Sequence, residues 1–144
     1  MKRLIWAAMA IIVSASGCTT LKPGTIGSSG LSQLNGSWEL NYISGPRIAF
    51  NGLYPGKKPV INFDISQKRV SGNSSCNSFS GELVADDTTV NFTGPMMSTK
   101  MACPGEGEAT FFEMLKKVNR YAVSSDTTLN FMMGDIAVMR FSKK

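Results

Sequence analysis

Two cysteines in turn-rich segments are the residues best suited to covalent chemistry in this sequence. Cys76 lies in a run of Gly, Asn and Ser over residues 70–81, and Cys103 lies in the short segment 98–104. Gly, Asn and Ser adopt unusual backbone angles and close local hydrogen bonds, so both segments are expected to be loops. In an oxidising compartment the two cysteines can form a disulfide that stabilises the domain by about 3 kcal/mol. The alternative is a pair of buried free thiols that pack near each other.

Four polar residues flank these cysteines, namely Asn73, Asn77, Thr99 and Lys100. Amide, hydroxyl and ammonium groups side by side can form a surface that recognises a ligand through hydrogen bonds. Asparagine and threonine also satisfy backbone groups within loops, which is the competing, purely structural interpretation. These four residues are the candidate binding surface, and both interpretations stay open at this point.

The sequence contains no histidine. This excludes Ser-His-Asp and Cys-His catalysis and metal sites built on imidazole. Carboxylates such as Asp86, Asp87 and Glu108 could act in catalysis, but their positions are ordinary for a turn and for the start of a helix. We therefore expect a protein that is not an enzyme and that needs no cofactor and no metal.

Six methionines are many for a domain of this size. Thioether groups can bind Cu(I), but methionine also fills irregular gaps in a hydrophobic core, which is the simpler interpretation. The six residues are Met96, Met97, Met101, Met132, Met133 and Met139.

Residues 1–17 have the pattern of a bacterial lipoprotein signal peptide. A short positive start precedes an apolar core over residues 4–13, which is too short to span a bilayer. Small residues then lead directly to Cys18 and resemble a lipobox, so Cys18 is expected to carry lipid after cleavage. Thr19 follows rather than aspartate, which in enterobacterial-type sorting implies the outer membrane, facing the periplasm. An ordinary cleaved signal with a chance cysteine is the alternative.

The remaining chain divides into a tether and one domain. Residues 18–31 are rich in Gly, Ser, Thr and Pro and are expected to form a flexible tether, whereas residues 32–144 suffice for a single core. The net charge is +5, and about +3 remains without Lys2 and Arg3 (13 basic minus 10 acidic residues). The basic residues are scattered, which argues against a nucleic-acid partner. The expected partners are the membrane, through the lipid, and an envelope protein.

Alternation of apolar and polar residues predicts about seven or eight short strands. They are expected over residues 34–43, 59–64, 67–72, 78–84, 88–92, 121–123, 127–133 and 136–141. In the first strand Tyr42 is expected to face the core, and in the last strand Ala137, Met139 and Phe141 are.

One helix is predicted over residues 108–120, where Phe111, Phe112, Leu115 and Val118 form an apolar stripe. Strands and helices do not alternate along the chain, so the sheet should be antiparallel. The predicted fold is α+β and mainly β, with a barrel-like or strongly bent antiparallel sheet and the late helix packed on it.

Several short motifs occur in an order that resembles the META (HslJ-like) domain family. They are Leu-Asn-Gly-Ser-Trp at 34–38, Val-Ser-Gly at 70–72, Cys-Asn-Ser-Phe-Ser-Gly at 76–81 and Ser-Thr-Lys-Met-Ala-Cys at 98–103. Ser75 departs from the pattern, because the family usually has glycine before Cys-Asn. The resemblance implies a barrel-like antiparallel sheet with a packed helix. It provides no catalytic residue, and it links such proteins to stress, antibiotic tolerance or motility.

These observations lead to one expectation of function and one alternative. The expectation is a lipid-anchored, non-enzymatic protein of the cell envelope that acts as a stress-related binding or protective module. The alternative is an inhibitor or assembly factor that contacts another envelope protein through the loop around Cys76.

Overall fold

The computed structural model describes residues 30–144, so the predicted signal peptide, Cys18 and most of the predicted tether lie outside the described residues. The main sheet consists of β1 (Gly36–Ile43), β2 (Val60–Asp64), β3 (Arg69–Asn73), β4 (Ser78–Glu82), β7 (Met96–Ser98), β8 (Arg120–Ser124), β9 (Thr128–Met133) and β10 (Ile136–Lys143). A small second sheet pairs β5 (Val84–Ala85) with β6 (Val90–Asn91). The helices are α1 (Gly30–Leu34), α2 (Phe50–Leu53) and α3 (Gly107–Lys117).

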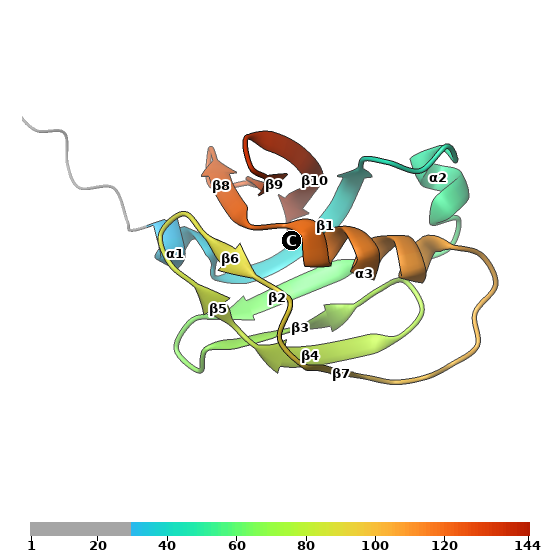
Figure 1. Cartoon of the computed structure of the whole chain (residues 1–144), viewed down its shortest axis with the longest axis horizontal. Coiled ribbons are helices and arrows are strands. Elements are labelled where there is room, and N and C mark those ends of the chain that lie inside the picture. Colours follow the sequence, from blue (N-terminus) through green and yellow to red (C-terminus); the bar gives the residue numbers. More distant parts are fainter. Residues whose placement is uncertain (1–29) are drawn as a thin grey trace, which may run out of the picture.

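The eight strands of the main sheet are all antiparallel and follow the order β7-β4-β3-β2-β1-β10-β9-β8 (Figure 1). The mainly β architecture with a late helix is therefore confirmed. Helix α1 begins at Gly30, so the last two residues of the predicted tether already belong to a helix.

The sheet is neither closed nor strongly curled, so the predicted barrel-like or strongly bent sheet was wrong in this respect. Strands β7 and β8 form its two edges and do not pair with each other. The edge of β8 is already occupied, because the Tyr121 amide donates to the Thr88 carbonyl at 3.0 Å and Thr89 bridges to Arg120. A segment that covers β8 in this way takes the backbone groups that closure would need.

Helix α3 lies over one face of the sheet and supplies much of the core (Figure 1). Phe111 and Leu115 are fully buried, and the ring of Phe79 on β4 lies 5.7 Å from that of Phe111 and 5.4 Å from that of Phe112. Complete burial of each such side chain stabilises the fold by about 1.5–3 kcal/mol. The helix ends earlier than predicted, at Lys117, because Val118 has an extended backbone that leads into β8 while its side chain stays buried.

Two bulges change which side chains of β1 and β10 face the core. The register shifts before Tyr42 in β1 and before Met139 in β10, so one extra residue enters each strand. Tyr42 is consequently 42% exposed, with the Arg140 guanidinium 5.4 Å from its ring centre. In β10 the adjacent Val138 and Met139 are both buried, whereas Ala137 is exposed. The predicted inward positions of Tyr42 and Ala137 were therefore wrong, and those of Met139 and Phe141 were right.

Candidate functional site

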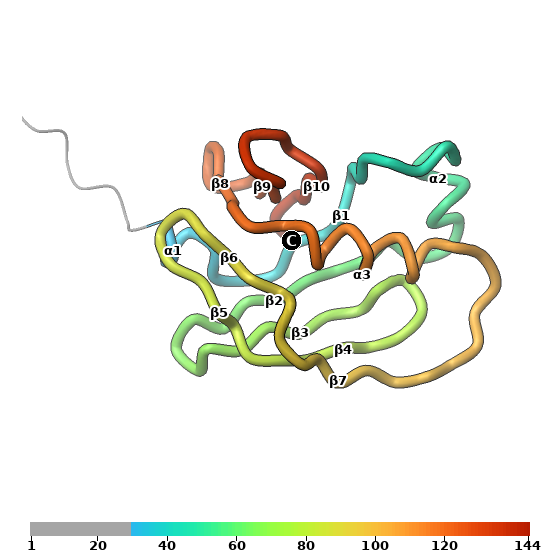
Figure 2. Tube along the Cα trace, in the orientation of Figure 1, coloured from blue at the N-terminus to red at the C-terminus, as the bar shows by residue number. Residues whose placement is uncertain are grey.

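A disulfide joins Cys76 in the β3–β4 loop to Cys103 in the segment that leads into α3. The two Cα atoms lie 6.1 Å apart, and the bond spans a sequence separation of 27. Figure 2 shows the chain leave β7 and pass outside the β3–β4 loop before it enters α3. Cys76 is half-buried and Cys103 is exposed. The bond therefore attaches a long exposed connection to the β3–β4 loop.

Asn77 is buried beside this disulfide and uses both ends of its amide. Its Nδ2 donates to the Met101 carbonyl at 3.1 Å and to Oε2 of Glu108 at 2.9 Å. Its Oδ1 accepts from the Met101 amide and from the Thr99 hydroxyl, both at 2.7 Å. A third contact of Nδ2, at 3.3 Å, reaches the Cys76 sulfur. The Asn77 side chain thus connects the β3–β4 loop, the 98–103 segment and α3.

Ser74 makes a second connection between the loop and α3. Its side chain is completely buried, and its hydroxyl lies 2.5 Å from Oε1 of Glu108. The backbone amide of Asn77 donates to the same hydroxyl at 3.1 Å. Glu108 lies in the first turn of α3, where the helix dipole favours a carboxylate. Its two oxygens therefore bind two loop side chains, which is the arrangement of a structural carboxylate.

The other two carboxylates that we considered for catalysis lie in the turn before β6. Asp86 accepts from the amides of Thr88 and Thr89, and these hydrogen bonds lower the pKa of this exposed carboxyl group. Asp87 accepts from the Leu31 amide at 3.3 Å. Both contacts are those of residues that shape a turn and hold a neighbouring helix.

The structure separates the four predicted binding residues into two kinds. Asn77 and Thr99 bond to each other, and the side-chain Oδ1 of Asn73 accepts from the Ser75 backbone amide at 3.0 Å. The side chains of these three residues therefore make hydrogen bonds within the protein. Lys100 is exposed and takes part in none of the ion pairs found among residues 30–144.

Ser75 adopts a backbone conformation that favours glycine, with φ at 84°. The Ser75→Gly substitution is therefore expected to raise the free energy of unfolding by about 0.5–1 kcal/mol, since relief of backbone strain exceeds the entropy gained by the unfolded chain. Urea unfolding of the full chain measures the change. Ser37→Gly in β1 is the control and should lose about 0.5–1 kcal/mol, because a strand position has no such strain. Equal losses in both variants would contradict the prediction.

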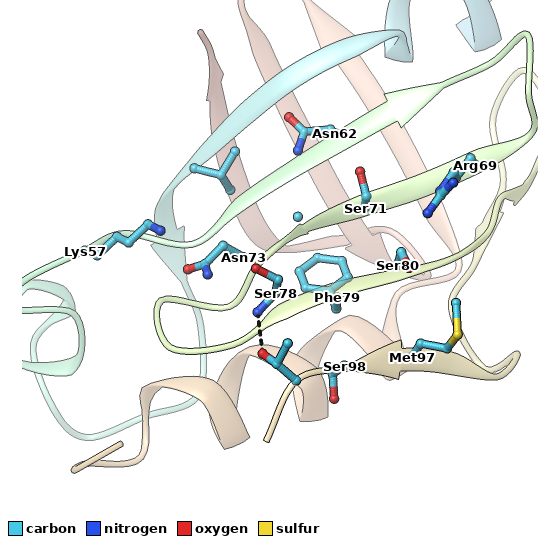
Figure 3. A pocket seen from close by; sticks show the side chains of 13 residues that line it. Lys57, Asn62, Arg69, Ser71, Asn73, Ser78, Phe79, Ser80, Met97 and Ser98 are labelled. Atoms are coloured by element: carbon cyan, nitrogen blue, oxygen red, sulfur yellow. Dashed lines mark hydrogen bonds between the residues drawn. The ribbon is translucent and has the colours of Figure 1, made fainter. Parts of the chain in front are cut away.

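A groove of about 670 Å³ lies on the outer face of β2, β3, β4 and β7, away from α3 (Figure 3). Asn62, Ser71, Ser80 and Met97 form one row across its floor, because they are direct neighbours in the strand register. Asn73 and Thr99 also line this groove, so two of the four predicted binding residues border it. The row was missed at the level of sequence, where these positions appear only as the solvent side of separate strands.

A second hollow, of about 610 Å³, lies beside the disulfide and the start of α3. Tyr54, Lys57, Cys76, Cys103 and Glu108 are among the residues that line it. Burial raises the pKa of Tyr54, whose hydroxyl donates to the Gly107 carbonyl at 2.9 Å. This tyrosine therefore packs α2 against α3.

The methionines considered for copper do not converge. Met96 and Met97 lie on β7 at one edge of the sheet, whereas Met132 and Met133 lie on β9, next to the opposite edge strand. Met139 is fully buried in the core. Within residues 30–144 no three His, Cys, Asp or Glu side chains form a group that could hold a metal ion, and no helix is long and apolar enough to cross a membrane.

Comparison with known proteins shows both the family and relatives of the fold. The model of the META domain matches residues 31–144. An NMR structure of a protein from Burkholderia xenovorans is similar with a TM-score of 0.63 and 20% identity, over 92% of this chain and 99% of that one. A crystal structure of a DUF4847 family protein from Bacteroides vulgatus has a TM-score of 0.53 and 18% identity, over 77% and 94% of the two chains. No curated protein matches. Because the family model covers the whole described domain, the chain belongs to the META domain family.

Proposed function

We propose that this protein is a lipid-anchored, non-enzymatic binding module of the cell envelope, held at the outer membrane on the periplasmic side. The observation that supports binding is the groove on the outer face of the sheet, where amide and hydroxyl side chains lie in one row without hydrogen-bond partners among residues 30–144. The lipobox that ends at Cys18 supports the lipid anchor. A stress-related role is consistent with what the family resemblance implies.

The polar row is available to a ligand because its side chains are not used inside the fold. Asn62, Ser71 and Ser80 are half-buried, yet within residues 30–144 their side chains make no hydrogen bond to another residue. Each amide or hydroxyl can both donate and accept. A ligand that satisfies them would replace water without breaking bonds within the protein.

The Cys18→Ser substitution tests the lipid anchor. The full-length wild-type chain should incorporate labelled palmitate and sediment with membranes, and the variant should lose the label and leave the membrane fraction. Thr20→Ser, two residues away, is the control and should behave like the wild type. A Cys18→Ser chain that stays labelled and membrane-bound would overturn the proposed anchor.

Gentle extraction of the native lipoprotein, followed by mass spectrometry of what accompanies it, tests the binding function. A groove variant with Asn62→Ala and Ser71→Ala should lose the accompanying molecule. Asn41→Ala, on the neighbouring part of the same face, should keep it. If the groove variant and the control retain the same molecules, or if nothing accompanies any form of the chain, the groove is not a binding site.

A second candidate function is inhibition or assembly of another envelope protein through the loop around Cys76. The observation that favours it is the segment 98–103, where Lys100 and the 60% exposed Met101 lie on a backbone held by the disulfide and by Asn77. A surface fixed in advance loses little entropy on binding. Lys100→Ala should then release an accompanying protein that the groove variant retains.

A further inference from the structure

We propose that the groove on the outer face of β2, β3, β4 and β7 binds an acidic glycan, that is, a sugar chain with carboxylate groups. This inference rests on the proposed binding function and names the class of its ligand. It depends on three features of the groove: a row of unpartnered polar side chains, a cation at each end, and recognition by side chains alone.

The outer face of the sheet has two halves that differ in how their polar side chains are used. On β1 and β10 the side chains have partners: Asn41 donates to Ser142 at 2.6 Å and accepts from Arg140 at 3.1 Å, and Glu39 pairs at 3.9 Å with Lys58, which precedes β2. On β2, β3 and β4 the corresponding row has no such bonds within residues 30–144. The difference identifies the groove, rather than the face as a whole, as the place where hydrogen-bonding capacity is left for a ligand.

The position of the groove favours a sugar chain over an extended peptide. A peptide that joins a sheet pairs its backbone with an edge strand, which among the strands of the groove is β7 alone. The row of amide and hydroxyl groups lies inside that edge, on β2, β3 and β4, where only side chains project from the face. Asn62, Ser71 and Ser80 present donor and acceptor groups on neighbouring strands about 4.8 Å apart. A sugar chain carries hydroxyl groups along its length that also both donate and accept, so it can meet such a row at successive points.

The charges around the groove favour carboxylate groups on that chain. Lys57 and Arg69 line the groove, no acidic side chain does, and Figure 3 shows these two cations at its opposite ends. Neither cation takes part in the ion pairs found among residues 30–144. Asp64 and Glu82 are the register neighbours of Arg69 and partly balance its charge, but they lie beyond the groove lining.

The spacing of the cations sets the length of the ligand. Arg69 and Asn73 are the first and last residues of β3, which separates them by about 13 Å along an extended strand. Figure 3 shows Lys57 beside the Asn73 end. A short chain with acidic units along its length can place one carboxylate near each cation while its hydroxyl groups lie over Ser71 and Ser80.

Titration of the full-length protein in detergent with a short oligogalacturonate, followed by calorimetry, tests the proposal. Hydrogen bonds and exposed ion pairs of this kind give weak binding, with a dissociation constant on the order of 0.1–1 mM at low salt. Lys57→Gln combined with Arg69→Gln should weaken binding by about tenfold, and added salt should weaken it too. Lys58→Gln combined with Arg140→Gln removes the same charge outside the groove, next to β1 and on β10, and should change binding less than about twofold.

Two further probes decide the class of ligand. The fully methyl-esterified oligomer, which has the same length and no charge, should bind about tenfold more weakly, and a polyglutamate peptide of equal charge should not bind in a groove-dependent way. Equal binding of charged and esterified sugars, groove-dependent binding of the peptide, or no binding of either sugar would overturn the proposal. If the groove variant still loses its accompanying molecule in the extraction experiment, only the ligand class is wrong; if it does not, the proposed binding function fails as well.

Discussion

The Asn77→Asp substitution is expected to lower the free energy of unfolding by about 3–5 kcal/mol at neutral pH. Asn77 is 3% exposed, and its Nδ2 donates to the Met101 carbonyl and to the Glu108 carboxylate. The substitution replaces this donor by a carboxylate oxygen that faces two acceptors. The buried charge keeps the Met101 amide and the Thr99 hydroxyl as donors, but it has no counter-charge and lies next to a charge of the same sign. Such a change is among the costliest single substitutions in a protein. Urea unfolding of wild type and variant in the same buffer measures the loss.

The pH dependence of this loss identifies its cause. Burial and the neighbouring Glu108 raise the pKa of the introduced carboxyl group in the folded state above its unfolded value of about 3.9. The introduced group therefore costs least below that unfolded value, and its full cost is present once the pH has risen through the folded pKa. The deficit of the variant relative to the wild type should shrink in acid. Asn77→Ala adds no charge. Its loss in free energy of unfolding should therefore be smaller than that of Asn77→Asp, and it should lack the decrease in acid that the introduced carboxyl group causes.

Asn41→Asp is the matched control for the same chemical change at an exposed site. Asn41 lies on β1 and accepts a hydrogen bond from Arg140, which an aspartate can also accept. The control should stay within about 0.5 kcal/mol of the wild type. If Asn77→Asp costs no more than Asn41→Asp, Asn77 is not the buried connection between loop and helix that the structure shows.

The strands were predictable from residues such as Ile61 and Phe63, which alternate with polar neighbours and do face the core. The face of Tyr42 was not predictable in this way, because a bulge inserts one residue and reverses the alternation from that point. Nothing in the local sequence marks this bulge, since it depends on how β1 and β10 pair across the fold. The same reason explains Ala137 and the open sheet, whose edges are set by distant segments.

The candidate site shows a similar limit. Cys76 and Cys103 attracted attention because of their types and their loops, and the structure joins them. Asn77 was predicted to lie on a binding surface, yet it is buried. The prediction could not separate the two cases, because an asparagine that satisfies a loop and one that binds a ligand look the same in sequence. The row over Asn62, Ser71 and Ser80 exists only through the strand register, so it required the pairing of β2, β3 and β4.

Replacing Cys76 and Cys103 together by serine is expected to lower the free energy of unfolding by about 3–4 kcal/mol, since the bond restricts an unfolded loop with a sequence separation of 27. For a domain of this size such a loss lowers the melting temperature by roughly 10–20 °C. Thermal and urea unfolding of the full chain measure it. Reduction of the wild type with a dithiol should give the same loss, because Cys103 is exposed to the reductant. A loss below about 1 kcal/mol would contradict the prediction.

A double-mutant cycle with Asn77→Ala separates the two ways in which the disulfide can act. If the bond acts only by restricting the unfolded chain, the cost of Asn77→Ala is the same with and without it, and the two losses add. If the bond also holds the 98–103 segment in place, its removal lets the segment open and takes with it the bonds of Asn77 to Thr99 and Met101. Because that segment is exposed along its length, we expect the second case, with a combined loss about 0.5–1 kcal/mol smaller than the sum. Strict additivity would show that Asn77 holds the segment without help from the disulfide.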